Sequence, residues 1–309
     1  MNPTDGRTRA LLVIACVPVM AGGLVLAALL GEAGGSADIV DGFAAPAVVA
    51  LAAAVLLVGL GGLPALGATP SSTAIGVTGG VWAAASLVAA WTRAADQVGT
   101  GIGEVGVGQF SEVMSHGAPD LVAAVCALAV VGWACADLLT GTGIPVQLVA
   151  VLGGVGLVAV AISAHPGTHA VMPVLVAVHA LAAAWWCGTL AALVLTVRGR
   201  SGWASGLPRF SELAAWAVLA LVLTGVVSAA IELGSVPALV TTGYGLVVVG
   251  KSAGLVALVA LAARHRAGWV PDAARHRSTQ AQSLRLAAVQ LAVMAVVLGL
   301  AAGLSVTAP

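Results

Sequence analysis

The sequence predicts an all-α protein that crosses a membrane nine times as a polytopic helical bundle. Apolar residues make up 60% of the 309 residues and charged residues only 8%, whereas a soluble domain carries about a quarter charged residues. The mean hydropathy of the chain is +1.09. The apolar residues are gathered into runs of about twenty, the length at which a helix spans a bilayer while satisfying its own backbone.

Nine runs of this kind are expected to form the spans. They lie at approximately 10–30, 43–63, 72–92, 119–139, 146–164, 172–197, 210–233, 244–264 and 286–306. The first is longer than the apolar core of a signal peptide, which has about 7–15 residues, and no small-x-small cleavage site follows it. We therefore expect it to be a retained helix, kinked at Pro18.

The arginines predict the orientation. Ten of the eleven arginines share one side if the N-terminus is cytoplasmic, and positive residues are retained on that side. Only Arg93 falls on the outer side. We therefore expect a cytoplasmic N-terminus and an outer C-terminus. The net charge of zero argues against nucleic acid as a partner.

Two membrane regions are expected, a five-helix region over 1–164 and a four-helix domain over 165–309. The longest outer loop, about 93–118, is rich in glycine and carries Met114 and His116. The longest inner loop, about 265–284, is interpreted as a solvated cytoplasmic face. All four cysteines lie in predicted helices, form no C-x-x-C pair, and are expected to pack as small apolar residues.

Polar residues within the spans are the first functional candidates, because a charge in hydrocarbon is costly and is kept where it has a partner or a task. Lys251 is the only lysine, and it lies well inside an apolar run. His179 is placed in the same way. Each is seven residues, or about 10 Å, below the outer end of its helix. Thr224, on the intervening span, is expected at a similar level.

A histidine-rich outer turn lies just above His179. His165 and His169 flank it, and Met172 follows. Imidazole binds either oxidation state of copper and thioether selects Cu(I), so these residues form a candidate copper set. His116 and Met114 are candidate additions from the neighbouring outer loop. The alternatives stay open that the turn histidines are only solvated, that His179 is a hydrogen-bonded core residue, and that Lys251 pairs with Glu232.

A series of residues in the C-terminal half carries a family resemblance. The stretch from His179 reads His-x6-Trp-x-Gly, and the later spans add Arg-Phe-Ser, Thr-Gly, Tyr-Gly-x5-Lys and Leu-Arg. In chain order the landmarks are His179, Trp186, Gly188, Arg209, Phe210, Ser211, Thr224, Gly225, Tyr244, Gly245, Lys251, Leu284 and Arg285. Together they resemble the copper resistance protein D (CopD) family over about 165–309. The preceding five helices look like the extension found before this domain in high-GC Gram-positive bacteria.

The resemblance implies copper handling at the cytoplasmic membrane, a multi-pass location and a four-helix domain. It makes Trp186, Tyr244 and Lys251 landmark positions, which we assign with Thr224 to the pathway. Two departures are visible. Thr189 stands where the family often has a second glycine, and Gln290 stands where it usually has a glutamate. The second departure questions any proton- or cation-coupled step that needs this charge.

The expected function is import of copper ions, captured by His165, His169 and Met172 and relayed past His179. Partners would be copper ions, the lipid bilayer and an extracytoplasmic copper chaperone or oxidase assembly factor. A non-transporting factor that delivers copper to cuproenzymes is the main alternative. A haem-binding electron carrier is a weaker one, because only His179 is placed within a predicted span and haem needs two axial ligands. No nucleotide-binding loop or hydrolase motif is present, so no enzyme is expected.

Overall fold

The computed structural model describes residues 3–33, 44–163, 169–233, 235 and 237–304. Within these ranges the chain is helical, and no strand forms. The elements are α1 (Pro3–Ile14), α2 (Cys16–Ala33), α3 (Ala44–Gly62), a 3₁₀ turn (Leu63–Leu66), α4 (Ser72–Val98), α5 (Val107–Ser115), α6 (Pro119–Thr140), α7 (Val146–Ser163), α8 (Met172–Thr196), α9 (Gly199–Leu233), α10 (Ala238–Thr241), α11 (Gly243–Ala267), α12 (Trp269–Ala274) and α13 (Gln280–Leu304).

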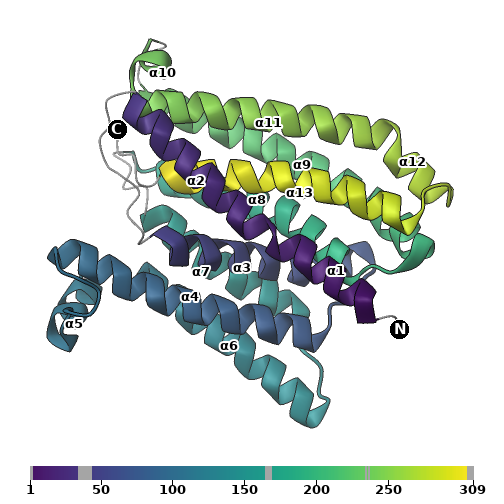
Figure 1. Ribbon diagram of the computed structural model, residues 1–309, viewed down its shortest axis with the longest axis horizontal. Helices are drawn as coiled ribbons and strands as arrows, with labels where there is room; N and C mark the ends of the chain where they lie inside the picture. Colours follow the sequence, from purple (N-terminus) through teal and green to yellow (C-terminus); the bar gives the residue numbers. More distant parts are fainter. Residues whose placement is uncertain (1–2, 34–43, 164–168, 234, 236, 305–309) are drawn as a thin grey trace.

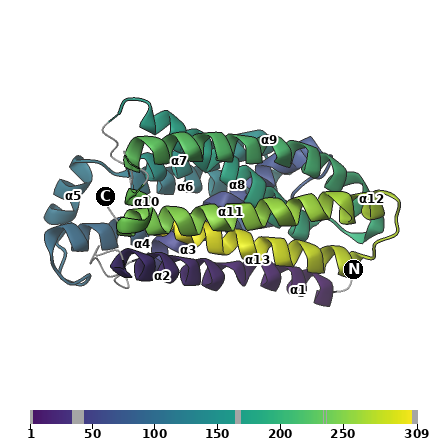
Figure 2. The ribbon, with the colours of Figure 1, turned by 90° about the horizontal axis from the view of Figure 1, so that it is seen from above.

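Nine helical segments among the described residues are long and apolar enough to cross a membrane, which confirms the predicted fold class. The long helices run side by side along the longest axis of the molecule (Figures 1 and 2). The chain is a multi-pass membrane protein. We call the end that holds the N-terminus and α12 the arginine end, and the opposite end, which holds α5 and α10, the α5 end. The predicted orientation places the arginine end in the cytoplasm.

The helices differ from the predicted runs mainly at their ends. The first span is interrupted at Ala15, between α1 and α2, because Pro18 has no N–H to donate to the carbonyl of Ile14. α9 begins well before the predicted residue 210 and is about 52 Å long at 1.5 Å per residue. Hydropathy detects only the part of a helix that hydrocarbon covers, so it missed the polar first turns of α9.

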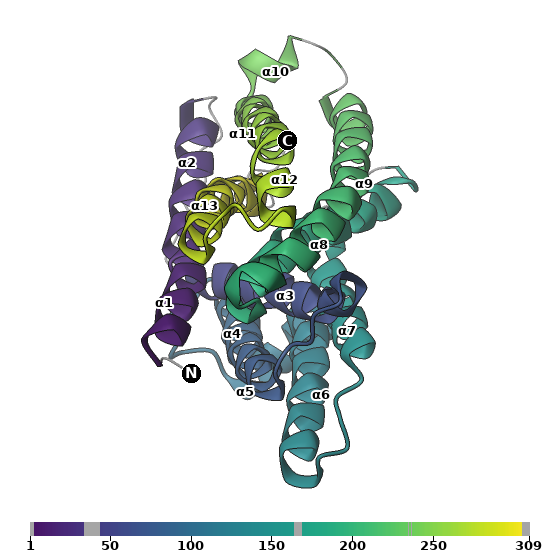
Figure 3. The same cartoon turned by 90° about the vertical axis from the view of Figure 1, so that its right-hand side faces the viewer.

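α3 is the central helix of the bundle. It packs against α2, α4, α7 and α8, and in the end-on view it lies between α2 and α13 on one side and α4, α6 and α7 on the other (Figure 3). Its most apolar stretch is 56% buried, against 11% for the span over Gly243–Ala274. One large hydrophobic core joins α3, α4, α6, α7, α8 and α9 with α11 and α13. Helices of the two predicted regions therefore share a core.

Two glycine contacts bring helices unusually close together. A Cβ added to Gly59 of α3 would collide with the backbone of Gly188 in α8, and one added to Gly188 would collide with the Val55 carbonyl. Gly23 of α2 and Gly299 of α13 face one another in the same way. Small residues allow such approaches in lipid, where dispersion contacts stabilise helix pairs. The position of α8 against α3 therefore depends on Gly188.

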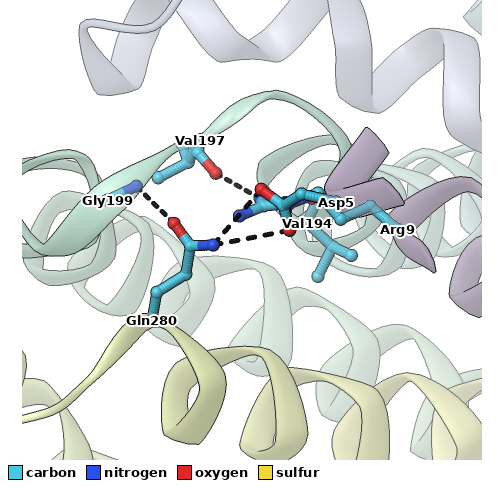
Figure 4. Close-up of polar contacts among 6 residues, drawn as sticks. All are labelled: Asp5, Arg9, Val194, Val197, Gly199 and Gln280. Carbon is cyan, nitrogen blue, oxygen red and sulfur yellow. Dashed lines mark hydrogen bonds and ion pairs between the residues drawn. The ribbon is translucent and has the colours of Figure 1, made fainter. Parts of the chain in front are cut away.

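A buried arginine fixes α1 to the end of α8 (Figure 4). Arg9 is 0% exposed. Its Nη1 donates to the carbonyls of Val194, at 3.0 Å, and of Val197. These carbonyls belong to the last turn of α8, where no further helical N–H can reach them. The guanidinium therefore caps the negative end of the α8 dipole.

The same site connects α13 to the start of α9. Asp5 accepts from Arg9 Nε at 3.2 Å and from Gln280 Nε2 at 3.3 Å. Gln280 Oε1 in turn accepts from the backbone N–H of Gly199 at 2.6 Å. Sequence alone assigns Arg9 to the cytoplasmic surface; the structure buries it, because the α8 carbonyls offer it acceptors. At the α5 end, Arg93 pairs with Asp120 at 2.6 Å, so the single arginine there is neutralised.

Gly188→Ala is expected to lower the melting temperature of the detergent-solubilised protein by several degrees. The added methyl group meets backbone, which can give way only by moving α3 from α8, and overpacking of this kind costs about 1–3 kcal/mol. Gly132→Ala is the matched control, since a Cβ there meets nothing within 4 Å. Equal melting temperatures for Gly188→Ala and the wild type would show that α3 and α8 are not held by this contact.

Arg9→Ala is expected to destabilise the protein more than Arg7→Ala, whose side chain is exposed. Loss of the guanidinium leaves the buried carbonyls of Val194 and Val197 without their donor, at a cost of about 1–3 kcal/mol. Thermal unfolding followed by tryptophan fluorescence measures the difference. If both variants melt together, the contacts of Arg9 contribute nothing net to stability.

Candidate functional site

His179 and Thr224 meet between α8 and α9. His179 Nδ1 lies 2.8 Å from Thr224 Oγ1, and both side chains are partly or wholly buried. Thr224 donates its hydroxyl proton to the Ala220 carbonyl at 2.6 Å, so its oxygen accepts from Nδ1–H of the imidazole. The neutral ring then carries its lone pair on Nε2. The equal depth predicted for these two residues thus corresponds to a direct contact.

Gly225 lies against the imidazole. A Cβ added there would lie 3.5 Å from His179 Cε1, which is ordinary van der Waals contact, so the ring packs over the backbone of α9 at this point. Thr224 holds the ring nitrogen, whereas the position of Gly225 would also accept a small side chain. Sequence reasoning recognised the Thr-Gly pair only through the family resemblance.

The outer turn is described in part. His165 lies outside the described residues. His169 is exposed just before α8, and its carbonyl accepts from the N–H of Met172 at 3.0 Å. Met172, the first residue of α8, is only 2% exposed. The two residues therefore lie next to each other at the N-terminal end of α8, where the imidazole of His169 is exposed and the thioether of Met172 is buried.

Met114 and His116 occupy another part of the α5 end. Met114 packs beside Ala94, Ala95 and Val105 in a small core formed with α4. His116 is exposed, and its Nδ1 lies 2.9 Å from the Glu112 carbonyl. Figures 1 and 3 both place α5 next to α4, away from α8 and α9. The structure does not bring Met114 and His116 to the N-terminal end of α8, and their role in copper binding stays a prediction.

Lys251 and Tyr244 lie on α11. Tyr244 packs beside Ala27, Val247 and Leu300 in a cluster shared with α2 and α13. Lys251 is partly buried, and its ammonium makes no hydrogen bond or ion pair with any residue in the described ranges. The structure thus brings His179 and Thr224 into contact. Lys251 lies on α11, a helix that packs mainly against α2 and α13 and has little contact with α9.

A second polar pair lies nearer the arginine end, and it corrects the sequence interpretation of His265. This residue belongs to α11 and is 6% exposed, so it is not part of a solvated loop. Its Nδ1 lies 2.8 Å from Gln290 Oε1 in α13, which is itself 3% exposed. Its ring meets the edge of Trp269 with ring centres 5.2 Å apart. α11 continues through Arg264 and Arg266 and ends at Ala267.

The pair lines an open pocket of about 250 Å³ between α8, α9, α11, α12 and α13. Trp186 forms part of the wall and is 2% exposed, so this landmark residue lies in the core beside the pocket. A sequence signal for the burial of His265 exists. Leu258, Ala262, His265 and Trp269 follow the spacing i, i+4, i+7 and i+11, which is one face of a helix. Because arginines flank His265 on both sides, the sequence analysis assigned this stretch to a solvated loop and did not detect the apolar face.

No three His, Cys, Asp or Glu side chains among the described residues gather closely enough to hold a metal ion. Cys187 is buried beside Gly188, and within the described ranges all four cysteines are free thiols. Among the described residues, His179 and His265 each stand apart from any such group.

Comparison with protein families addresses the C-terminal third of the chain, which carries the His265–Gln290 pair and Thr224. Residues 204–304 match the model of the family described as copper resistance protein D. This C-terminal region is similar to copper resistance protein D. No curated protein and no solved structure matches the chain. In the matched region lie Thr224, Lys251, His265 and Gln290, while His179 and Trp186 precede it on α8.

Thr224→Val is expected to release the imidazole of His179, because valine has the same shape but no acceptor for Nδ1–H. Thr224→Ser keeps the hydroxyl and is the control. In protein labelled with ¹⁵N-histidine, the Nδ1-protonated form should predominate in the wild type and the serine variant and should lose its excess in the valine variant. Loss of the bond should also cost about 1 kcal/mol of stability. An unchanged spectrum for Thr224→Val would contradict the hydrogen bond.

Proposed function

We propose that this protein imports copper ions across the cytoplasmic membrane without catalysing a reaction. The observation that carries the proposal is the His179–Thr224 hydrogen bond, which fixes an imidazole in place between two membrane-spanning helices. The matched copper resistance family supplies the identity of the ion. With Nδ1–H held by Thr224, the lone pair of the neutral ring is on Nε2, and Nε2 is the nitrogen that commonly binds copper.

The proposed copper path begins at the N-terminal end of α8. An incoming ion meets His169 on the surface and then the buried thioether of Met172. His165, four residues before His169 in the sequence, is proposed as a further ligand. His179 lies seven residues further along α8, about 10 Å at 1.5 Å per residue. Imidazole and thioether both bind Cu(I), so each of these residues offers the ion a soft or borderline ligand.

Electrostatics favours inward movement. A negative-inside potential lowers the energy of an inward cation by about 2.3 kcal/mol per charge for each 100 mV. No nucleotide is required for this step. The ammonium of Lys251 lies on the α11 side, where it repels a cation that strays from the interface between α8 and α9. A chaperone or oxidase assembly factor at the α5 end would supply or receive copper there.

Copper content of intact cells tests the proposal. Cells expressing the wild type should accumulate more copper than cells without the protein, and His179→Gln should abolish the gain. Glutamine retains a hydrogen-bonding group for Thr224 but has no imidazole. His276→Gln is the matched control, because His276 is an exposed histidine outside the path. All variants are compared at equal membrane abundance.

An unchanged copper content in wild-type cells would exclude import. If the purified protein nevertheless bound copper at His179, the protein would be a delivery factor that holds copper without flux. A gain that persists in His179→Gln would remove His179 from the path. These outcomes differ from one another and from the control, so each part of the proposal can fail separately.

A further inference from the structure

The open pocket between α8, α9, α11, α12 and α13 combines a mostly apolar lining with one cation. Phe210 and Val218 of α9 and Val259 of α11 belong to the apolar part. Arg266 is the only charged residue among the described residues that line it. On α11 it lies seven residues, or about 10 Å, nearer the arginine end than Val259. The charge of the pocket is therefore at the end nearest the membrane surface.

The guanidinium of Arg266 is available to an anion. Its side chain is exposed, and it forms no hydrogen bond or ion pair with any residue in the described ranges. Glu212 of α9 and Asp272 of α12 are the acidic residues that the five lining helices carry toward the arginine end. Neither of them lines the pocket. Within the described part of the chain, the pocket therefore presents a positive charge without a counter-ion.

The surroundings of the pocket also favour an anion over a metal cation. Between residues 199 and 285, arginines greatly outnumber carboxylates at this end of the molecule. They are Arg200, Arg209, Arg264, Arg266, Arg275, Arg277 and Arg285. Basic segments next to membrane spans attract anionic lipids, and basic pockets between membrane helices bind the headgroups of such lipids.

We propose that this pocket binds an anionic phospholipid of the leaflet at the arginine end. Arg266 binds the phosphate through charge-assisted hydrogen bonds, and an acyl chain lies along Phe210, Val218 and Val259. The pocket, at about 250 Å³, is smaller than the sites that enclose whole small molecules, so the rest of the lipid stays in the bilayer. The inference goes beyond copper import and does not depend on it, because no metal takes part.

The apolar lining favours a lipid over a free phosphate ion. A free ion would have to leave water for a largely apolar wall, which is costly. A phospholipid carries its phosphate on chains that already lie in hydrocarbon. The pocket is open, and two of its walls, α9 and α11, contact one another only lightly. A chain can therefore enter between these helices from the bilayer.

A lipid bound here would hold α11 against α9. The span over Gly243–Ala274 has only 11% of its most apolar stretch buried, the lowest share among the nine spans of the described residues. A ligand that binds only the folded protein stabilises it. Phosphatidylglycerol is therefore expected to raise the melting temperature of the delipidated protein more than phosphatidylcholine does.

Mass spectrometry of the intact purified protein, released from detergent after addition of equal amounts of phosphatidylglycerol and phosphatidylcholine, tests the site. The wild type should retain phosphatidylglycerol preferentially. Arg266→Gln should lower this preference about tenfold, the order of effect of one charge-assisted hydrogen bond. Arg264→Gln is the matched control, because it removes the same charge from an exposed arginine of α11 that does not line the pocket. Equal preferences in Arg266→Gln and the wild type, or equal losses in both variants, would overturn the proposal.

A second pair of variants tests the pocket itself rather than its charge. Ala263 lines the pocket and is exposed, so Ala263→Phe should fill the space and reduce the retained phosphatidylglycerol although Arg266 is intact. Ala267→Phe adds the same ring at an exposed position outside the lining and should retain lipid as the wild type does. Wild-type retention by Ala263→Phe would show that only surface charge attracts the lipid, which contradicts the pocket site.

Inorganic phosphate distinguishes the lipid from a small anion. In large excess it should leave the retained phosphatidylglycerol in place, because it lacks the chain that occupies the apolar lining. Displacement of the lipid by phosphate would show that the site recognises the anion alone and would overturn the proposed occupant.

Discussion

The close contact between Gly59 and Gly188 sets the position of α8, and most of the candidate chemistry is placed by α8. The helix carries Met172, His179 and Trp186 at fixed intervals from this contact. Its other end is held by Arg9, which satisfies the carbonyls of the last turn. In lipid there is no water to accept a displaced backbone group. A shift of α8 would therefore move the imidazole from Thr224 and uncover the capped carbonyls together.

The two histidine pairs share one physical arrangement. In each, Nδ1 is held by an oxygen on a different helix, at 2.8 Å, so the ring is oriented and its tautomer is fixed. A polar side chain that is buried without a partner is costly, which explains why both rings have one. The partner also decides which ring nitrogen carries the proton. Stability and the orientation of the ring are therefore linked in these pairs.

The family match begins within α9 and ends within α13. It therefore contains the whole of the His265–Gln290 pair but only one member of the outer pair, Thr224. His179 lies on the preceding helix and reaches the matched domain across the α8–α9 interface. The glutamate expected in the last helix is Gln290 here, and its amide oxygen still accepts the imidazole proton. Glutamine at this position carries no charge and accepts the hydrogen bond from His265.

The sequence by itself determined the helical class, the number of spans and the depth of His179 and Thr224. Hydrocarbon imposes these features on each segment separately, through the length and polarity of its residues. Tertiary structure alone decided the burial of Arg9 and His265. Each lies among charged or polar neighbours in sequence, and each is buried because a different helix presents carbonyls or an amide to it. Hydropathy records depth along the membrane normal and carries no information on which helix lies beside which, so lateral partners could not be predicted.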